Sequence, residues 1–349
     1  MAETTLAETT LAETTPAEET LAKTPLLDVR DLCVTYRSGG KRVRATRNAS
    51  FSIMPGESIG VVGESGSGKS TMMMAALRLL NPKTTEVSGE VVFDGTSDLL
   101  KLTDTEMNRL RWTDIAIVFQ KAMNALSPVH RISTQVEDIY RVHEPKATKE
   151  EIRERMVELL RLVNLPERVY RLYPHEMSSG MLQRVSIALA LLHNPRLLVF
   201  DEATTALDVV TQGQILSEVC QLEKELHTTR VMITHDMSVV AASCSKVAVM
   251  YAGELMEVGT VREVLKDPKH PYTQGLLDSF PSLRGEVTRL KSIPGFLPDL
   301  AEDIPGCVFA PRCPRACEQC RLHRPPTCTL PGGRSVRCWL YEGGETDGE

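Results

Sequence analysis

The segment from residue 63 to residue 70 limits, more than any other, what this chain can fold into. It reads Gly63-Glu64-Ser65-Gly66-Ser67-Gly68-Lys69-Ser70. The pattern is that of a phosphate-binding loop, whose glycines let backbone N–H groups converge on phosphate oxygens at the start of a helix. An apolar stretch at 58–62 predicts a strand before the loop, and residues 72–80 predict a helix after it. This unit predicts a P-loop α/β fold that binds a nucleotide.

Polar side chains suited to nucleotide chemistry lie in the loop and at the end of a second predicted strand. Lys69 can reach the β- and γ-phosphates, and Ser70 can bind Mg²⁺. The apolar run at 197–200 ends in Asp201, which can hold Mg²⁺, and Glu202, which can orient the attacking water. The two carboxylates could instead only cap the next helix, but the loop upstream already requires a metal partner. Together these residues predict nucleotide hydrolysis.

The remaining pattern predicts a mixed β-sheet core that is interrupted by helices. An antiparallel β layer is expected within 27–54, and a helical insert over about 122–192. Apolar runs at 197–200 and 231–234, separated by a helical stretch, are typical of buried parallel strands, so the core resumes after the insert. A hairpin over 246–258 closes the domain.

The two ends of the chain differ from this core. Residues 1–25 repeat the unit Ala-Glu-Thr-Thr-Leu without aromatic side chains, so we expect a disordered tail, and residues 343–349 form an acidic tail. A formal net charge of −6 argues against a broad basic surface, so we expect no nucleic acid partner. The sequence offers no apolar stretch of about 20 residues and no secretory signal pattern. We therefore expect a chain that stays in the cytosol and does not itself cross a membrane.

Four further segments narrow the class of enzyme. They are Val118-Phe119-Gln120, the run Tyr-Pro-His-Glu-Met-Ser-Ser-Gly-Met-Leu-Gln-Arg at 173–184, Ala206-Leu207-Asp208 and Thr234-His235-Asp236. In order and spacing they resemble the Q-loop, signature, D-loop and H-loop of the ABC ATPase family, and the resemblance covers about residues 26–280. It implies an ABC cassette over 26–265 and a head-to-tail dimer, with ATP held between one subunit's phosphate loop and the other's signature.

The resemblance also implies a role for each site residue. Glu202, His235 and Lys69 would be the catalytic residues, with His235 against the γ-phosphate, although a histidine there could also be a core residue. Three residues would bind Mg²⁺: Ser70, Gln120 and Asp201. Tyr36 would stack on adenine, or would only pack at the end of its strand. The nucleotide contacts would be Tyr36, Gly63, Glu64, Ser65, Gly66, Ser67, Gly68, Lys69, Ser70, Thr71, Gln120, Ser178, Ser179, Gly180 and Asp208.

Two positions depart from the family pattern. The signature has Ser178-Ser179-Gly180 where the family usually has Ser-Gly-Gly, so a Cβ lies where a backbone normally approaches phosphate. Because the signature serves ATP on the partner's loop, we expect any defect at the partner's site. Ala203 replaces a common proline, which loosens the backbone but removes no chemical group. We expect this chain's own site to keep its hydrolysis.

The extension at 266–342 indicates an importer. Residues 267–277 resemble the segment that follows the cassette in dipeptide, oligopeptide and nickel importer ATPases. That subfamily often ends in a cysteine cluster, and the resemblance implies a [4Fe–4S] site formed by Cys307, Cys313, Cys320 and Cys338. Zinc is the main rival, because Cys317 and Cys320 form a C-x-x-C pair and His323 could replace a ligand; unliganded thiols or a redox disulfide are the third alternative. Any such metal should stabilise an extension too small to have its own core.

These features predict the ATP-binding and hydrolysing subunit of an ABC importer, with di- or oligopeptides as the expected solute. It would lie peripherally at the cytoplasmic face of the cell (inner) membrane. Its partners would be two membrane-spanning permease subunits, a second and non-identical ABC ATPase and, indirectly, an extracytoplasmic solute-binding protein. The alternatives are a soluble ABC ATPase in DNA repair or translation and an exporter subunit. The former usually carry a coiled-coil insertion or two cassettes, and the latter often fuse cassette and membrane domain.

Overall fold

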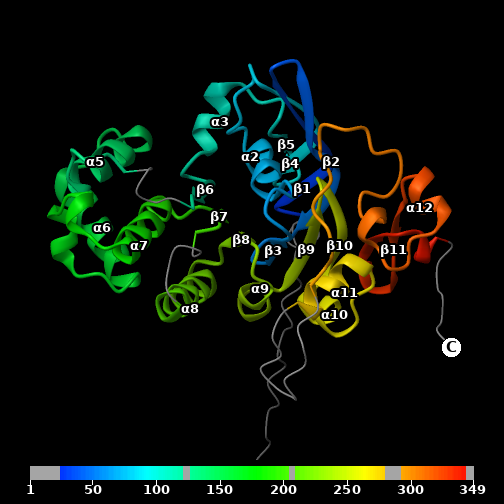
Figure 1. Ribbon diagram of the computed structural model, residues 1–349. Helices are drawn as coiled ribbons and strands as arrows, with labels where there is room; N and C mark the ends of the chain where they lie inside the picture. Colours follow the sequence, from blue (N-terminus) through cyan, green and yellow to red (C-terminus); the bar gives the residue numbers. More distant parts are fainter. Residues whose placement is uncertain (1–23, 121–125, 204–208, 280–291, 343–349) are drawn as a thin grey trace, which may run out of the picture.

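The computed structural model describes residues 24–120, 126–203, 209–279 and 292–342. A central core of two sheets lies between a helical insert and a C-terminal extension, which occupy opposite sides of the molecule (Figure 1). None of the helices in the described ranges combines the length and apolar character that a membrane crossing needs. Apart from residues 24 and 25, the predicted tails at 1–25 and 343–349 lie outside these ranges.

The four-stranded sheet is antiparallel, with the order β2-β1-β4-β5. Its strands are β1 (Leu27–Ser38), β2 (Lys41–Ile53), β4 (Thr85–Phe93) and β5 (Ser97–Asp98). The antiparallel layer is thus confirmed, but β2 begins at Lys41, ahead of the expected start at residue 49. Of the eight added residues at 41–48, four are charged and only Val43 and Ala45 are apolar, so apolar patterning could not reveal them.

The eight-stranded sheet has the order β11-β12-β10-β9-β3-β8-β7-β6. Six of its strands belong to the cassette: β3 (Ser58–Val62), β6 (Ile115–Val118), β7 (Leu197–Asp201), β8 (Thr229–Thr234), β9 (Lys246–Tyr251) and β10 (Glu254–Thr260). The other two, β11 (Thr327–Thr329) and β12 (Ser335–Arg337), come from the extension. Strands β6, β7, β8, β3 and β9 are parallel, and β10 returns antiparallel to β9, which confirms the expected hairpin. Every residue of β7 and β8 is buried, as expected for strands covered on both faces.

Helices cover this sheet and form the insert. Around the core lie α2 (Lys69–Ala76), α3 (Asp104–Leu110), α8 (Val209–Leu226), α9 (Met237–Ser243) and α10 (Val261–Lys266). The insert contains α5 (Ile132–His143), α6 (Lys149–Leu162), η1 (Glu167–Arg171), η2 (Pro174–Glu176) and α7 (Ser179–Ala190), drawn in green in Figure 1. Thr148 and Glu151 form the predicted capping box at the start of α6. Helix α2 ends at Ala76, four residues before the expected end, because Arg78 has a positive φ of 53°.

The extension continues the large sheet. Its elements are α11 (Pro271–Asp278), η3 (Ala310–Arg312), α12 (Glu318–Leu322), β11 (Thr327–Thr329), η4 (Pro331–Gly333), β12 (Ser335–Arg337) and η5 (Trp339–Tyr341). Strand β12 pairs antiparallel with β10 of the cassette, and β11 pairs with β12. This pairing could not be predicted from the sequence, because three-residue strands carry too little periodicity to be recognised.

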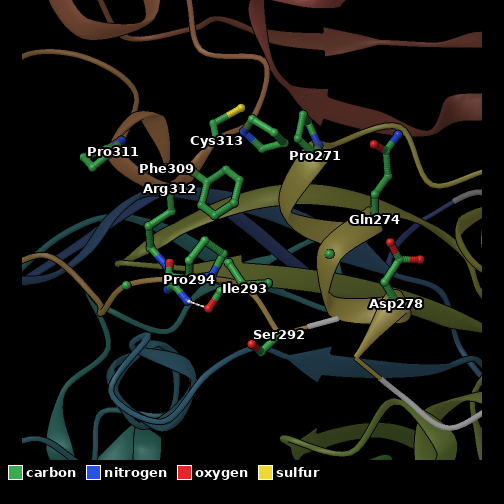
Figure 2. Close-up of a pocket in the computed structure, with 13 residues that line it drawn as sticks. Pro271, Gln274, Asp278, Ser292, Ile293, Pro294, Phe309, Pro311, Arg312 and Cys313 are labelled. Atoms are coloured by element: carbon green, nitrogen blue, oxygen red, sulfur yellow. Dashed lines mark hydrogen bonds between the residues drawn. The ribbon is translucent and has the colours of Figure 1, made fainter. Parts of the chain in front are cut away.

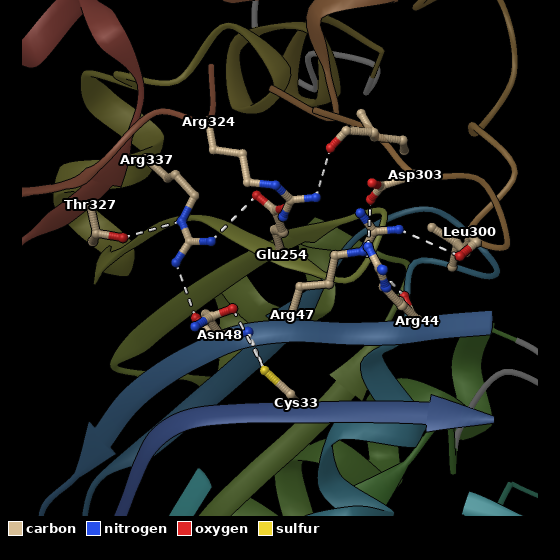
Figure 3. A network of polar contacts seen from close by, with 11 residues as sticks. Cys33, Arg44, Arg47, Asn48, Glu254, Leu300, Asp303, Arg324, Thr327 and Arg337 are labelled. Carbon is tan, nitrogen blue, oxygen red and sulfur yellow. Dashed lines mark hydrogen bonds and ion pairs between the residues drawn. The ribbon is translucent and has the colours of Figure 1, made fainter. Parts of the chain in front are cut away.

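Two buried glutamates of β10 hold the extension in place. Glu254, 1% exposed, accepts hydrogen bonds from Arg324 at 2.5 Å and Arg337 at 3.3 Å (Figure 3). Glu257, also 1% exposed, pairs with the buried Arg334. Because an unpaired buried charge is costly, these ion pairs make the docked position of the extension specific.

Candidate nucleotide-binding site

The 63–70 loop connects β3 to α2 and needs glycine at two positions. Gly63 has a φ of 153°, and a Cβ there would lie 2.0 Å from the Met250 carbonyl oxygen. Gly68 caps α2 with a φ of 101°, and a Cβ there would lie 2.2 Å from the Ala45 carbonyl oxygen. Both neighbours are backbone atoms that cannot move aside easily. The loop can therefore keep this close-packed form only with glycine at these two positions.

Lys69 places a buried cation inside the loop. Its Nζ donates to the carbonyl oxygens of Gly63 at 2.8 Å and Glu64 at 2.9 Å. The residue is only 4% exposed, and burial lowers its pKa, while the nearby carboxylates of Glu202 and Asp201 oppose this. The ammonium also lies 3.5 Å from the Ser67 hydroxyl oxygen. All three acceptors are uncharged, so the group is well suited to receive phosphate oxygens.

Ser70 and Asp201 meet where the predicted metal would lie. The Ser70 Oγ donates to Asp201 Oδ1 at 2.6 Å, which joins the start of α2 to the carboxyl end of β7. Asp201 is 5% exposed, and burial raises its pKa above the ordinary range. A hydroxyl and a carboxylate oxygen are the hard ligands that Mg²⁺ prefers, so this pair fits a magnesium ion that is also bound by phosphate.

Glu202, Gln120 and His235 lie at the same edge of the sheet. Asp201 of β7 pairs with Ile233 of β8, so Glu202 and His235 follow neighbouring strands. The Gln120 amide donates to Glu202 Oε2 at 2.8 Å, and Glu202 has a positive φ of 47°. The carboxylate that was predicted to orient water is thus held by the glutamine that was predicted to sense magnesium.

The remaining predicted nucleotide contacts lie in two places: Tyr36 and Thr71 meet at the start of α2, and the signature residues 178–180 lie at the start of α7 in the insert. The Tyr36 hydroxyl lies 3.2 Å from Thr71 Oγ1, which places this tyrosine of β1 against the start of α2. Ser178 caps α7 by accepting from the Met181 N–H at 3.3 Å, and Ser179 is the first residue of α7. Within the described ranges, no hydrogen bond or ion pair joins the signature at 178–180 to the 63–70 loop. Asp208 lies outside the described residues.

Comparison with known proteins identifies the family. Residues 46–205 match the family model described as ABC transporter, and residues 256–320 match the Oligopeptide/dipeptide transporter, C-terminal region. A probable peptide ABC transporter ATP-binding protein from Sinorhizobium fredii is 43% identical, over 90% of this chain and 94% of that protein. The chain belongs to the ABC transporter family of ATP-binding proteins. As an ABC ATPase, it binds and hydrolyses ATP to drive transport.

Other proteins similar to this ABC ATPase are also ABC transport ATPases or ABC cassettes. The oligopeptide transport ATP-binding protein OppD of Haemophilus influenzae is 42% identical, over 90% of this chain and 97% of that protein. The dimeric bacterial ABC transporter cassette MJ0796 is 32% identical to this chain, with a TM-score of 0.61. The match covers 68% of this chain and 99% of MJ0796. The cassette cbiO1 of Clostridium perfringens is 28% identical with a TM-score of 0.58, over 70% and 91% of the two chains. These relatives give no support to a role in DNA repair or translation.

The extension of this ABC ATPase contains a cavity that is lined partly by cysteines. The cavity has a volume of about 180 Å³, and five cysteines contribute to its lining: Cys307, Cys313, Cys317, Cys320 and Cys338. Burial raises the pKa of the Cys307 thiol to about 12 and that of Cys338 to about 11. All four predicted cluster ligands line this cavity, together with Cys317, which forms the C-x-x-C pair with Cys320.

The cysteine sulfurs are gathered but are not arranged as a ligand set. The Cys317 and Cys320 sulfurs lie 3.4 Å apart, as expected for a C-x-x-C pair. Among the residues that the structure describes, no group of three or more histidine, cysteine, aspartate or glutamate side chains has the geometry to hold a metal ion. The expected iron–sulfur or zinc site is therefore not supported as a preformed centre, and only the donor atoms fit.

Two residues of the extension reach the phosphate loop, and sequence reasoning missed both. The Glu64 N–H donates to the Tyr272 hydroxyl at 3.1 Å, and the Glu64 carboxylate accepts from Arg312 at 2.9 Å. These residues are separated from Glu64 by 208 and 248 positions. No local pattern connects positions so far apart, so only the folded chain brings them together.

Proposed function

We propose that this ABC ATPase energises the import of di- and oligopeptides from the cytoplasmic face of the cell membrane. One observation carries the proposal: a chain with a complete phosphate loop also matches the C-terminal region of oligopeptide and dipeptide transporters over residues 256–320. Its relatives include peptide and oligopeptide transport ATP-binding proteins, which supports the same solute class. Two permease subunits, a second ATPase and an external solute-binding protein would complete the transporter.

The site residues would act together on MgATP. Lys69 would turn its ammonium group from the loop carbonyls to the β- and γ-phosphates, and Tyr36 would stack on adenine. Ser70, Asp201 and Gln120 would hold Mg²⁺, which supplies positive charge beside the phosphates when it is bound. Glu202 would orient the attacking water, and His235 would contact the γ-phosphate.

The signature at 178–180 would serve a second ATPase, with Asp208 at the shared interface. In the proposed head-to-tail pair, ATP on the partner's loop would meet Ser178, Ser179 and Gly180, which are exposed or half-buried at the start of α7. ATP would bind more tightly to the closed pair than to the open one, so its hydrolysis would reopen the pair. A non-identical partner would give two unequal sites.

The test uses the transporter assembled in proteoliposomes with a fluorescent tripeptide outside and MgATP inside. Glu202→Gln should lower ATP hydrolysis at this chain's own site about 100-fold or more while ATP binding is kept, and should lower peptide uptake; Lys69→Ala should lose ATP binding. Normal uptake with Glu202→Gln would show that Glu202 is not the catalytic base. Hydrolysis without any peptide uptake would contradict the solute assignment and leave the ATPase intact.

We further propose that Cys307, Cys313, Cys320 and Cys338 bind a [4Fe–4S] cluster that cross-links the extension. The proposal is supported by their shared cavity, and their thiols would have to lose their protons and move closer together. The full chain, purified without oxygen, should be brown and contain about four iron atoms and four sulfides. A colourless protein with one zinc atom would favour zinc, and a metal-free protein would contradict both.

A further inference from the structure

The carboxylate of Glu64 lies within the loop that is proposed to receive phosphate. A negative charge at this position would oppose the binding of an anionic nucleotide, unless another group compensates for it. Lys69 contacts only the backbone carbonyl of Glu64, at 2.9 Å. The charge of the Glu64 side chain is balanced instead by Arg312, whose Nη1 lies 2.9 Å from both carboxylate oxygens.

Arg312 is held in place by groups other than Glu64. Its Nε donates to the Pro294 carbonyl at 2.8 Å and its Nη2 to the Ile293 carbonyl at 3.2 Å. Figure 2 shows its side chain extending from the segment that carries Cys313 toward Ile293. The Nη1 also donates to the Tyr251 hydroxyl at 3.2 Å, and the side chain is only 7% exposed. The guanidinium is therefore fixed in advance by the extension and by β9.

A cluster of three aromatic side chains packs beside the contact between Arg312 and Glu64. Tyr272 of α11 and Tyr251 of β9 have ring centroids 4.7 Å apart, and Phe309 packs against both, at 5.3 and 5.2 Å. The Tyr272 hydroxyl accepts from the Glu64 N–H at 3.1 Å. Both the backbone and the side chain of Glu64 are thus held from outside the cassette's own loop.

We propose that Arg312 is a positioning residue for nucleotide binding: by neutralising and orienting Glu64, it sets the affinity of the phosphate loop for MgATP. The proposal rests on the assignment of residues 63–70 as the ATP loop. It gives the extension a role at the nucleotide site. Because Arg312 directly precedes Cys313, which lines the cysteine cavity, a change in that cavity would also move the arginine.

The experiment separates charge from packing with three variants of the full chain. Arg312→Gln removes the charge but keeps donors for the two carbonyls, Arg312→Lys keeps the charge, and the double variant Arg312→Gln with Glu64→Gln removes the charge that needs compensation. We expect Arg312→Gln to raise the Kd for MgATP about five- to tenfold, and the lysine and double variants to recover most of the affinity. Isothermal titration gives Kd, and thermal melts report folding.

Arg337→Gln is the matched control. Arg337 is also an arginine of the extension, but it pairs with Glu254 and does not contact the loop. This variant should lower the melting temperature and leave the Kd for MgATP unchanged. In the assembled transporter, Arg312→Gln should raise KM by the same factor as Kd and change kcat by less than about twofold.

Four results would overturn the proposal. If the double variant binds MgATP as weakly as Arg312→Gln, or if Arg337→Gln weakens binding equally, the extension acts only through stability. If Lys69→Ala keeps the wild-type Kd, the ATP loop itself is misassigned, and this proposal fails together with the proposed site. If Lys69→Ala binds MgATP more weakly but Arg312→Gln keeps the wild-type Kd, the ATP loop is correctly assigned and only the role of Arg312 is overturned.

Discussion

Gly68 shows how the folded chain dictates a single residue. The position needs both a left-handed backbone, with a φ of 101°, and room beside the Ala45 carbonyl oxygen. A side chain would have to satisfy both demands together, since the loop runs directly into α2. The glycines of the pattern Gly-x-x-x-x-Gly-Lys-Ser could therefore be assigned a structural role from sequence alone. The contact with Ala45 could not, because it comes from another strand.

Replacing this glycine should damage both the loop and its ligand binding. Gly68→Ala should lower the free energy of unfolding by about 2 kcal/mol and weaken MgATP binding about tenfold or more, because the backbone must shift. Urea denaturation and isothermal titration measure the two effects. The control is Gly213→Ala in α8, where a Cβ meets nothing within 4 Å, and which should stabilise the protein by about 0.5–1 kcal/mol. Tight MgATP binding by Gly68→Ala would show that the loop tolerates a side chain.

At the scale of elements, α11 begins at a buried histidine. The His270 Nδ1 accepts a hydrogen bond from the Tyr272 N–H at 3.0 Å, which caps the helix, and the residue is 1% exposed. Burial lowers the pKa of His270 to about 3. Its sequence context, Pro268-Lys269-His270-Pro271, indicated an importer-type segment but not this cap, because burial depends on the docked extension.

The buried His270 should make stability depend on pH. Its pKa is about 3 in the folded state and about 6.5 in the unfolded state. The unfolded chain therefore takes up the proton first, and stability falls as the pH drops from about 6.5 toward 3. At pH 5 we expect a loss of about 2 kcal/mol relative to pH 8, measured by urea denaturation. His270→Asn, which keeps an acceptor for the cap, should flatten this dependence. An equally steep loss in the asparagine variant would exclude His270 as its source.

The pairing of Glu257 with Arg334 joins the extension to β10. Both residues are at least 95% buried, so removal of one leaves a buried charge without an oppositely charged partner. Arg334→Met should lower the free energy of unfolding by about 3–5 kcal/mol, and adding Glu257→Gln should recover much of this loss. Urea denaturation gives the values, and limited proteolysis shows release of the extension. Arg30→Met, which breaks an exposed pair with Glu90, should change little. If Arg334→Met and Arg30→Met lowered the free energy of unfolding equally, the pairing of Glu257 with Arg334 would not be what docks the extension.

At the scale of the whole molecule, local patterns predicted the core but not how its parts meet. The strand, loop and helix around Lys69 are continuous in sequence, so their spacing was sufficient to predict the phosphate-binding unit. Strands β11 and β12 were missed because their apolar content is low and their partner, β10, lies far away in the chain. The contact of Arg312 with Glu64 was missed for the same reason.

The signature at 178–180 is proposed to act only in the assembled pair of ATPases. Ser179 is the first residue of α7. The insert that contains this helix lies on the side of the core away from the extension (Figure 1). If it serves ATP on the partner's loop, its Cβ slows the partner's site and not its own. Ser179→Gly should then raise phosphate release by the assembled transporter about two- to fivefold.

A second variant shows whose site responds. Glu202→Gln disables this chain's own site, so the hydrolysis that remains belongs to the partner. Ser179→Gly should still raise this remaining rate if the signature acts across the interface, whereas Ser133→Gly, in the first turn of α5 in the same insert, should not. A gain that disappears in the Glu202→Gln background would mean that Ser179 acts on its own subunit's ATP. The head-to-tail pairing would then have to be abandoned, because that geometry gives the signature no access to its own loop.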